Sequence, residues 1–292
     1  MSVAQKFAEI TKTREPLAPY THLRIGGPAD FLVQPRTVDE LRAVLKYCAA
    51  ADVSVRMLGG GNNLLVRDDP VPGVVVRLAG PAFTGVETTG KTVRAAGGGP
   101  LFDLIAHAVQ AGLSGLETLV GIRGTVGGSV RCNVGDRSGE IAASVRRVAV
   151  LADDGTEQVR GRDELGFGEH SSDLAEPVIL WVEFGLEPDA PDAILKRMRR
   201  AWVARKGSEP LSFQAAVRMF RDPPGATAAA LIDRAGLAKT RVGGAEVSDR
   251  NGNYAVAHPG TTARDVLRLI ELVRTRVVES TGVSLRQELH VW

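Results

Sequence analysis

Hydrophobic residues in the first 186 positions alternate between short continuous runs and stretches with helical spacing. This alternation predicts strands and helices in turn, as in a mixed α and β protein. Apolar runs predict strands at 29–35, 53–58, 73–78, 92–98 and 177–186, and an Asp-Asp-Gly turn predicts a hairpin within 145–160.

Two helices are predicted among these strands. Thr37 and Glu40 have the spacing of a capping box, which predicts that a helix begins after Thr37. Apolar residues recur at helical spacing from Leu41 to Cys48, so we predict that Cys48 is a small buried side chain rather than a reactive thiol. A second helical pattern covers residues 101–113.

The hydrophobic pattern changes after residue 186. Residues 187–193 are acidic, contain proline and lack periodicity, so this segment is the predicted boundary between two parts of the chain. The following thirteen residues, 194–206, carry six basic side chains, which we interpret as the solvated face of a helix. The remaining pattern predicts a smaller α+β unit, with strands at 215–221, 244–257 and 283–292 and helices at 226–236 and 263–281.

Composition and charge narrow the class of protein. The 292 residues are 44% hydrophobic and 24% charged, which is typical of a folded protein of about two domains. A net charge of +2 gives little attraction for nucleic acid or acidic membranes. The chain has two cysteines, no C-x-x-C and no metal-type histidine spacing, and neither a signal-peptide pattern nor an apolar run of about 18 residues. We expect a soluble, cytoplasmic, monomeric protein without a metal ion and without nucleic-acid or membrane partners.

One apparent nucleotide-binding motif lacks the secondary structure that it requires. Residues 85–92 match the letters of a phosphate-binding P-loop, but Lys91 is followed by an alternating strand pattern instead of a helix. We therefore predict a hairpin turn at Gly90-Lys91. The chain also lacks G-x-G-x-x-G and G-x-S-x-G, which argues against a nucleotide-fold dehydrogenase and a serine hydrolase.

Three glycine-dense segments remain, at residues 24–29, 58–64 and 121–128, the last continuing to 132–135. Consecutive glycines between apolar strands expose backbone N–H groups that can surround an anion, and Asn62 and Asn63 add amide donors. Each segment alone is compatible with ordinary turns. Together they favour a pyrophosphate cradle.

These segments resemble a known enzyme family. THLRIGGPADFLVQP, LGGGNNLLVRD and GLETLVGIRGTVGGSVRCNVGDRSGEI are similar to segments of the UDP-N-acetylenolpyruvoylglucosamine reductases, also called UDP-N-acetylmuramate dehydrogenases. RMFRDPPG, ALIDRAGL and LRQELHVW fit the same family in the same order, so the resemblance covers nearly the whole chain.

The resemblance implies a fold and a reaction. It implies an α+β protein with a two-subdomain FAD-binding domain of the vanillyl-alcohol-oxidase type, followed by a smaller α+β substrate domain. The corresponding boundaries are 1–80 and 81–188 for the FAD subdomains, 189–206 for a linker helix and 207–292 for the substrate domain. The implied enzyme acts in peptidoglycan precursor synthesis, where NADPH reduces FAD and an enolpyruvyl sugar nucleotide then takes the hydride.

The resemblance also indicates binding residues. Loop 59–63 is expected at the FAD phosphates and residues 122–128 along the isoalloxazine. The full cofactor set is Arg24, Gly26, Gly59, Gly60, Gly61, Asn62, Asn63, Gly121, Ile122, Gly124, Thr125, Val126, Gly127, Gly128 and Asn133. The substrate set is Arg221, Arg241 and Asn253, with Arg218 and Arg286 as further cations in segments that match the family's substrate side.

Two of three catalytic positions depart from the family pattern. The family's proton-donating serine lies in A-G-S-x-F-K-N-P, and the matching stretch 216–223 has Arg218 there. The family's catalytic arginine in F-x-Y-R-x-S corresponds to His170. The glutamate near the end of the chain is kept as Glu288, which we expect on the face of the last strand opposite Leu285 and Leu289.

An exchange of roles is one interpretation of these departures. Arginine keeps its proton above pH ~12 and suits a carboxylate clamp, whereas histidine titrates near neutral pH and can donate a proton. Under this hypothesis His170 is the donor, Arg218 the clamp, and Glu288 orients or shares the proton. The alternatives are a flavin-binding relative that has lost the reaction, a flavin oxidase for another substrate and, for Glu288 alone, an exposed ion pair with Arg286.

Overall fold

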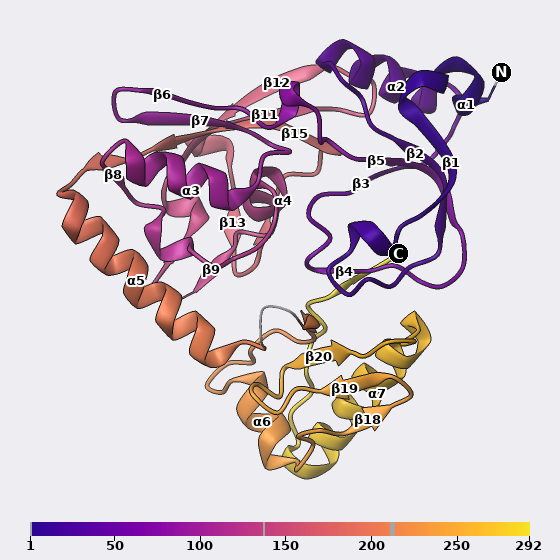
Figure 1. Ribbon diagram of the computed structural model, residues 1–292, viewed down its shortest axis with the longest axis vertical. Coiled ribbons are helices and arrows are strands. Elements are labelled where there is room, and N and C mark those ends of the chain that lie inside the picture. The colour runs from indigo at the N-terminus through magenta and orange to yellow at the C-terminus, as the bar shows by residue number, and fades with distance from the viewer. Residues whose placement is uncertain (1, 137, 211–213) are drawn as a thin grey trace. The chain divides into compact units, whose positions relative to one another are not determined.

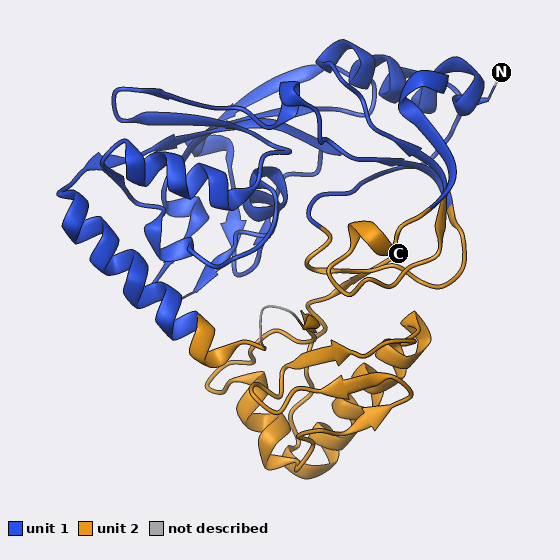
Figure 2. Cartoon of the chain, viewed as in Figure 1, with its two compact units in different colours: residues 1–15, 30–60, 72–205 blue, residues 16–29, 61–71, 206–292 orange. Residues whose placement is uncertain are grey.

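The computed structural model describes residues 2–136, 138–210 and 214–292, and the chain forms two compact units (Figure 2). The first unit comprises residues 1–15, 30–60 and 72–205. The second comprises residues 16–29, 61–71 and 206–292. The predicted boundaries at 80/81, 188/189 and 206/207 stay predictions, and the second unit takes in two early segments besides the C-terminal residues.

A four-stranded sheet opens the first unit, in the order β1 (Thr11–Pro16), β2 (Pro28–Val33), β5 (Val71–Val76) and β3 (Val55–Met57) (Figure 1). Strands β3 and β5 are parallel, with Val55 opposite Val74. The short helix α1 (Val3–Lys6) precedes the sheet, and α2 (Val38–Ala50) packs its apolar face, including Leu41 and Cys48, into the same core. Burial raises the pKa of Cys48, which agrees with the predicted core role.

A five-stranded antiparallel sheet forms the rest of the first unit. Its order is β12 (Glu157–Gly161), β11 (Val145–Leu151), β15 (Val178–Gly185), β7 (Thr92–Ala96) and β6 (Val86–Thr89). Helices α3 (Leu101–Gln110) and α4 (Val126–Arg131) share one apolar core with this sheet. The β6–β7 turn is the hairpin predicted at Gly90-Lys91, with Thr89 opposite Thr92.

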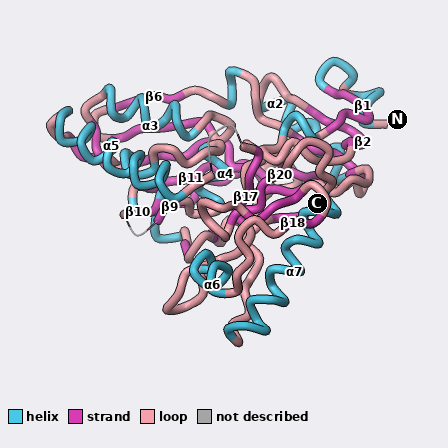
Figure 3. Tube along the Cα trace, turned by 60° about the horizontal axis from the view of Figure 1, so that its bottom comes forward, coloured by secondary structure: helices cyan, strands magenta, loops and turns pink. Residues whose placement is uncertain are grey.

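The second unit contains an antiparallel sheet in the order β17 (Ala215–Arg218), β20 (Tyr254–Ala257), β19 (Ala245–Val247) and β18 (Arg241–Val242). Helix α7 (Ala263–Thr281) contacts α6 (Ala228–Arg234) and the strands β18, β19 and β20 (Figure 3). A capping box at Thr262 begins α7, and Gly282 ends it in the left-handed region at φ 72°.

Several short elements complete the chain. The parallel pair β4 (Leu64–Leu65) and β21 (His290–Val291) lies in the second unit. In the first unit, β8 (Leu113–Ser114) pairs with β16 (Glu187–Pro188), β9 (Gly135–Asp136) with β10 (Gly139–Glu140), and β13 (Phe167–Gly168) with β14 (Ser171–Ser172). Single turns of 3-10 helix occur at Ala8–Ile10, Ala18–Tyr20, Pro81–Phe83, Glu117–Leu119, Ile141–Ala143 and Arg162–Glu164.

Three sequence predictions need correction. The segment 187–193, whose sequence lacks a periodic pattern, nevertheless contains regular structure, because β16 pairs with β8 and α5 (Pro191–Ser208) has already begun. The last strand shrinks from 283–292 to His290–Val291, because its partner β4 has only two residues; a single bridge joins Phe220 to Gln287 upstream.

The third correction concerns the start of α2. Thr37 Oγ1 accepts the Glu40 N–H at 3.1 Å, as a cap should. The Glu40 carboxylate, however, accepts the Arg36 N–H at 2.7 Å instead of the Thr37 N–H, so only half of the predicted capping box forms. Arg36 also pairs with Glu40 and Glu9, which explains the different choice of donor. Within the described residues, no helix has the length and apolar character to cross a bilayer.

Candidate functional site

The glycine loop between β3 and β4 contacts the third glycine segment within the first unit. A Cβ at Gly59 would lie 2.9 Å from Thr125 Oγ1, closer than a side chain tolerates. Thr125 is the N-cap of α4, and its Oγ1 accepts the Gly128 N–H at 3.3 Å. Gly60, the next residue, is exposed. Two of the three predicted cofactor segments therefore meet at Gly59 and Thr125.

The same loop continues into the second unit, where Gly61 packs against backbone. Gly61 has φ 62°, and a Cβ there would lie 2.3 Å from Tyr20 O. The His22 N–H donates to Gly61 O at 3.0 Å, and Asn63 Nδ2 donates to Glu288 O at 3.3 Å. Asn62 is half-buried. Asn63 and Glu288, which the sequence assigns to different tasks, are thus neighbours in one unit.

The first glycine segment lies beside residues 66–69. A Cβ at Gly26 would lie 2.7 Å from Val66 Cβ, and a Cβ at Gly27 would lie 2.3 Å from Asp69 O. Arg24 is exposed and has φ 55°. Close packing within the second unit therefore requires these glycines, whatever else they bind.

The third segment uses some of its amides internally. Val126 and Gly127 donate their N–H groups to Gly99 O and Gly97 O, each at 2.8 Å. Gly121 has φ 89° and Gly124 has φ 146°, conformations that favour glycine, and Ile122 between them is half-buried. Segment 121–125 therefore adopts a backbone that few other sequences could follow.

Asn133 cross-links the end of α4 to the loop that carries His170. Its side chain is buried, its Nδ2 donates to Glu140 Oε2 at 2.8 Å and to Gly168 O at 2.9 Å, and its Oδ1 accepts the Ala142 N–H at 3.2 Å. Both amide N–H groups are used in this way. The contacts give Asn133 a structural task that the sequence pattern did not indicate.

His170 lies in a tight turn between β13 and β14. It has φ 50°, is half-buried, and follows Glu169 at the tip of the hairpin. Ser172 Oγ donates to Arg131 O at 3.0 Å, so both strands of the hairpin are tied to the end of α4. Within the first unit, His170 is therefore attached to the same helix that Thr125 begins.

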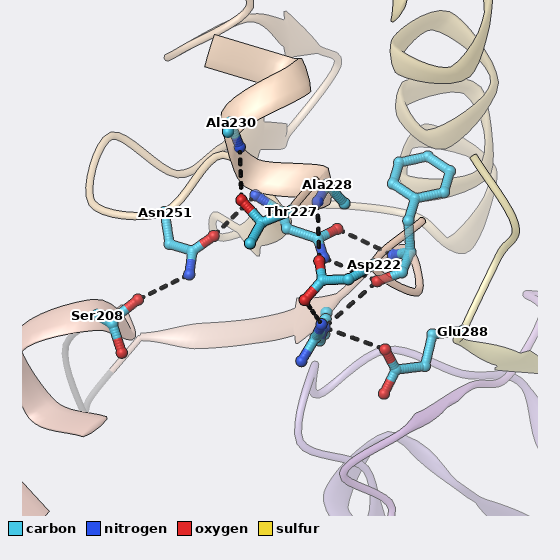
Figure 4. Close-up of polar contacts among 10 residues, drawn as sticks. Ser208, Asp222, Thr227, Ala228, Ala230, Asn251 and Glu288 are labelled. Atoms are coloured by element: carbon cyan, nitrogen blue, oxygen red, sulfur yellow. Dashed lines mark hydrogen bonds and ion pairs between the residues drawn. The ribbon is translucent and has the colours of Figure 1, made fainter. Parts of the chain in front are cut away.

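The second unit gathers a charged centre, which we define as Arg218, Asp222 and Glu288 (Figure 4). Arg218 Nε lies 3.0 Å from Glu288 Oε2, and Arg218 Nη2 donates to Asp222 Oδ2 at 2.9 Å. The exposed fractions of the three side chains are 29%, 37% and 12% in the order Arg218, Asp222, Glu288, so water screens this centre only in part.

These charges act on the protonation of Arg218. Burial disfavours its charged guanidinium, but the carboxylates of Glu288 and Asp222 outweigh burial and hold the pKa of Arg218 above its ordinary value. Arg218 is therefore a permanent cation. Among the described residues, Glu288 forms its ion pair with Arg218 and not with Arg286, as the alternative interpretation had it.

A network of amides supports the charged centre. The Phe220 N–H donates to Asn253 Oδ1 at 3.0 Å, and Asn253 Nδ2 donates to Phe220 O at 2.7 Å. Asn251 Oδ1 accepts the Asn253 N–H at 3.0 Å, while Asn251 Nδ2 donates to Ser208 O at 2.8 Å (Figure 4). Asn253, predicted on the substrate side, is buried and fixes the backbone next to Arg218.

Asp222 joins the charged centre to α6. Its Oδ1 accepts the Ala228 N–H at 2.8 Å at the start of that helix, where Thr227 is the N-cap (Figure 4). Its other oxygen binds Arg218. Sequence analysis did not include Asp222 among the site residues; its position four residues after Arg218, with the opposite charge, was the available signal.

The two further predicted substrate arginines differ in their surroundings. Arg241 is exposed and binds Glu246, which His258 Nε2 also contacts at 2.8 Å. Although burial disfavours its charged form, Arg241 and His258 keep the pKa of Glu246 below its ordinary value. Arg221 is half-buried, and within the described part of the chain its buried Nε has no hydrogen-bond partner. Arg221 therefore retains a buried donor without a partner among the described residues, whereas Arg241 is paired with Glu246.

Comparison with known proteins agrees with this organisation. A family model described as "FAD binding domain" matches residues 29–160, and one described as "UDP-N-acetylenolpyruvoylglucosamine reductase, C-terminal domain" matches residues 209–292. These matches confirm the predicted α+β fold class, an FAD-binding domain followed by a smaller reductase domain.

Relatives match nearly the full length. The UDP-N-acetylenolpyruvoylglucosamine reductase of Rubrobacter xylanophilus is 39% identical over 294 residues, covering 98% of this chain and 97% of that protein. The reductase of Rhodopirellula baltica is 33% identical over 283 residues, covering 97% and 93%. The crystal structure of the Thermus caldophilus reductase superimposes with a TM-score of 0.82 at 39% identity, covering 97% of this chain and 98% of that one. The chain belongs to the UDP-N-acetylenolpyruvoylglucosamine reductase family.

Proposed function

We propose that this protein reduces UDP-N-acetylenolpyruvoylglucosamine to UDP-N-acetylmuramate with FAD as cofactor and NADPH as electron donor. The observation that carries the proposal is the full-length similarity to reductases of this name, at 39% identity over 98% of the chain for one of them. With the reaction we infer a role in peptidoglycan precursor synthesis, a cytoplasmic location and a monomer that needs neither membrane nor nucleic acid.

The glycine segments fit FAD. A Cβ would fill the space at Gly59 beside Thr125, and Gly121 and Gly124 have positive φ. Glycine at these positions leaves the backbone without side chains where a ligand must approach it closely. Amides of residues 59–63 would bind the phosphates, and residues 122–128 would lie along the isoalloxazine, with Arg24, Gly26, Gly121 and Asn133 as the outer members of the set. Bound there, FAD would supply the hydride-transfer chemistry between NADPH and the enolpyruvyl double bond.

Reduction of an enolpyruvyl group leaves negative charge beside a carboxylate, and this charge requires a cation. Arg218 keeps its proton because Glu288 and Asp222 raise its pKa, so it supplies positive charge and no proton. Arg221 offers a buried Nε donor for the substrate carboxylate or phosphates, and Arg241 and Asn253 complete the proposed substrate set.

The proton must come from another group. We assign it to His170, because an imidazole can serve as a general acid and because this residue lies at the family's arginine position. Its hairpin is fixed by Asn133 and Ser172, which restricts where the imidazole can move. Glu288, 3.0 Å from Arg218, orients the guanidinium.

Product analysis tests the proposal. The purified protein, supplied with FAD, NADPH and UDP-N-acetylenolpyruvoylglucosamine, should form the saturated lactyl ether, which mass spectrometry distinguishes from the substrate. Failure to take up FAD would contradict the proposal outright. FAD uptake without product would favour the catalytically silent relative, and peroxide formation with a different substrate would favour the oxidase.

A further inference from the structure

The long helix α5 binds other parts of the first unit, although its composition suggests a solvated helix. Among its described residues only Ile194 is buried, and the sequence presents its six basic residues as a solvated face. Two of them, Arg197 and Arg205, instead bind other parts of the first unit. Both contact the chain between β8 and β9, directly before or within the third glycine segment.

Arg197 is fixed by carboxylates. Its Nε lies 2.6 Å from Glu117 Oε1 and its Nη2 lies 2.7 Å from Asp189 Oδ2. Glu117 is 5% exposed, and its Oε2 also accepts the Gly115 N–H at 2.6 Å. Burial opposes the charged form of Glu117, but the Gly115 amide and Arg197 prevail and lower its pKa. This ion pair, in which Glu117 is buried and Arg197 is partly exposed, ties α5 to the turn that begins at Gly115.

Arg205 reaches further along the same loop. Its Nη1 donates to Val120 O and, at 3.3 Å, to Thr118 O, while its Nη2 lies 2.7 Å from Asp136 Oδ2. A Cβ at Gly121 would lie 3.4 Å from Arg205 Cδ, so the side chain runs directly over this glycine. The exposed fraction of Arg205 is 10%.

The loop needs such support. Residues 118–124 comprise the end of a single 3-10 turn and the segment after it. That segment passes through Gly121 at φ 89° and Gly124 at φ 146°, so regular helix or strand bonds do not hold it. Carbonyls at the end of a helical turn lack partners within it, and Arg205 supplies donors to two of them.

We propose that Arg205 is a positioning residue that holds loop 118–124 in the conformation FAD binding requires, with the Arg197–Glu117 pair fixing the start of the same loop. The proposal rests on the proposed function, because it takes this loop to be part of the FAD site. Helix α5 is then a brace of the cofactor site rather than a simple connector.

The test compares Arg205→Met with Arg200→Met, a matched change at an exposed arginine of the same helix. Methionine retains much of the aliphatic stem but no donor. Losing charged hydrogen bonds to the loop should weaken FAD binding about tenfold or more in Arg205→Met, measured by quenching of flavin fluorescence. Arg200→Met should stay within about twofold of the wild type, and Arg205→Lys should recover part of the loss, since an ammonium can reach one carbonyl.

Hydrogen exchange on the FAD-free proteins provides the second readout. Arg205→Met should lose amide protection across 118–124, whereas Arg200→Met should not. Wild-type affinity for FAD in Arg205→Met, or an equal loss in both variants, would overturn the positioning role. A wild-type protein that takes up no FAD would contradict the proposed function itself, and the positioning role would fall with it.

Discussion

The glycine segments and the charged centre meet different physical demands. Around Gly59, Gly61 and Gly121 the constraint lies in the backbone, because positive φ or a close neighbour excludes a side chain. In the charged centre the constraint lies in side-chain pairing, where Arg218 is balanced by Glu288 and Asp222. A backbone constraint leaves one acceptable residue, whereas a charge constraint can be met by coordinated replacement. This contrast predicts that the proposed cofactor segments keep the pattern of the resembling family, and that replacements occur at the predicted catalytic positions 170 and 218.

The largest effect should come from a glycine. Gly61→Ala places a Cβ 2.3 Å from Tyr20 O at φ 62°, so the loop must move. We expect a loss of about 3 kcal/mol or more in the free energy of unfolding, together with loss of FAD binding. Gly90→Ala is the control, because Gly90 has φ 59° with open space around it. Its cost should be about 1 kcal/mol, from backbone strain alone. Equal costs in urea denaturation would show that close packing does not constrain the loop.

In the charged centre, the effects of substitutions at Arg218 and Glu288 on stability should be coupled. Arg218→Met leaves two carboxylates without their shared guanidinium, and we expect a loss of about 1–2 kcal/mol, a value reduced by partial exposure. Glu288→Gln in the Arg218→Met background should recover part of this loss, because the uncompensated charge is then gone. Urea denaturation of both single variants and the double variant measures the coupling, and strictly additive losses would argue against the ion pair.

Substitutions of the two proposed substrate arginines, Arg221 and Arg241, should differ in their effect on KM. Arg221→Gln should raise KM for the sugar nucleotide about tenfold with little change in kcat, because it removes an available cationic donor. Arg241→Gln should change KM about twofold or less, because Glu246 already engages that guanidinium. Steady-state kinetics of the two variants decide the matter, and a larger effect at Arg241 would reverse the assignment.

The smallest expected effect is the loss of stability in Glu117→Gln, and this loss depends on pH. The folded-state pKa of Glu117 lies below the ordinary value of 4.5, so its ionised form stabilises the native state at neutral pH. Glu117→Gln should cost about 1 kcal/mol at pH 7. The difference from the wild type should shrink as pH falls below 4.5 and through the lower folded pKa. Glu87→Gln, at an exposed position of β6, is the matched control substitution, and a pH-independent difference at Glu117 would exclude an electrostatic origin.

The sequence could predict elements whose cause is local. Helix α7 follows from its hydrophobic spacing, and the turn at Gly90 follows from the strand pattern around it. The pairing of Arg218 with Glu288 could not be predicted in the same way, because Glu288 reaches it only through the pairing of distant segments. The last strand was predicted too long, since its length depends on the two-residue partner β4. The contact of Arg205 with Val120 could likewise not be predicted, because it depends on the fold and the sequence places Arg205 among basic residues of a solvated helix face.

We expect the protein to be a working reductase with His170 and Arg218 at the predicted catalytic positions. Flavin absorbance followed without oxygen, first with NADPH and then with UDP-N-acetylenolpyruvoylglucosamine, measures this directly. NADPH should bleach the flavin and the sugar nucleotide should restore its colour, whereas His170→Ala should lose the second step while keeping the first. Two results together would contradict this expectation and identify a catalytically silent flavoprotein. The flavin of the wild type would stay reduced after addition of the sugar nucleotide, and the flavin of the variant that combines Arg218→Ser with His170→Arg would be reoxidised.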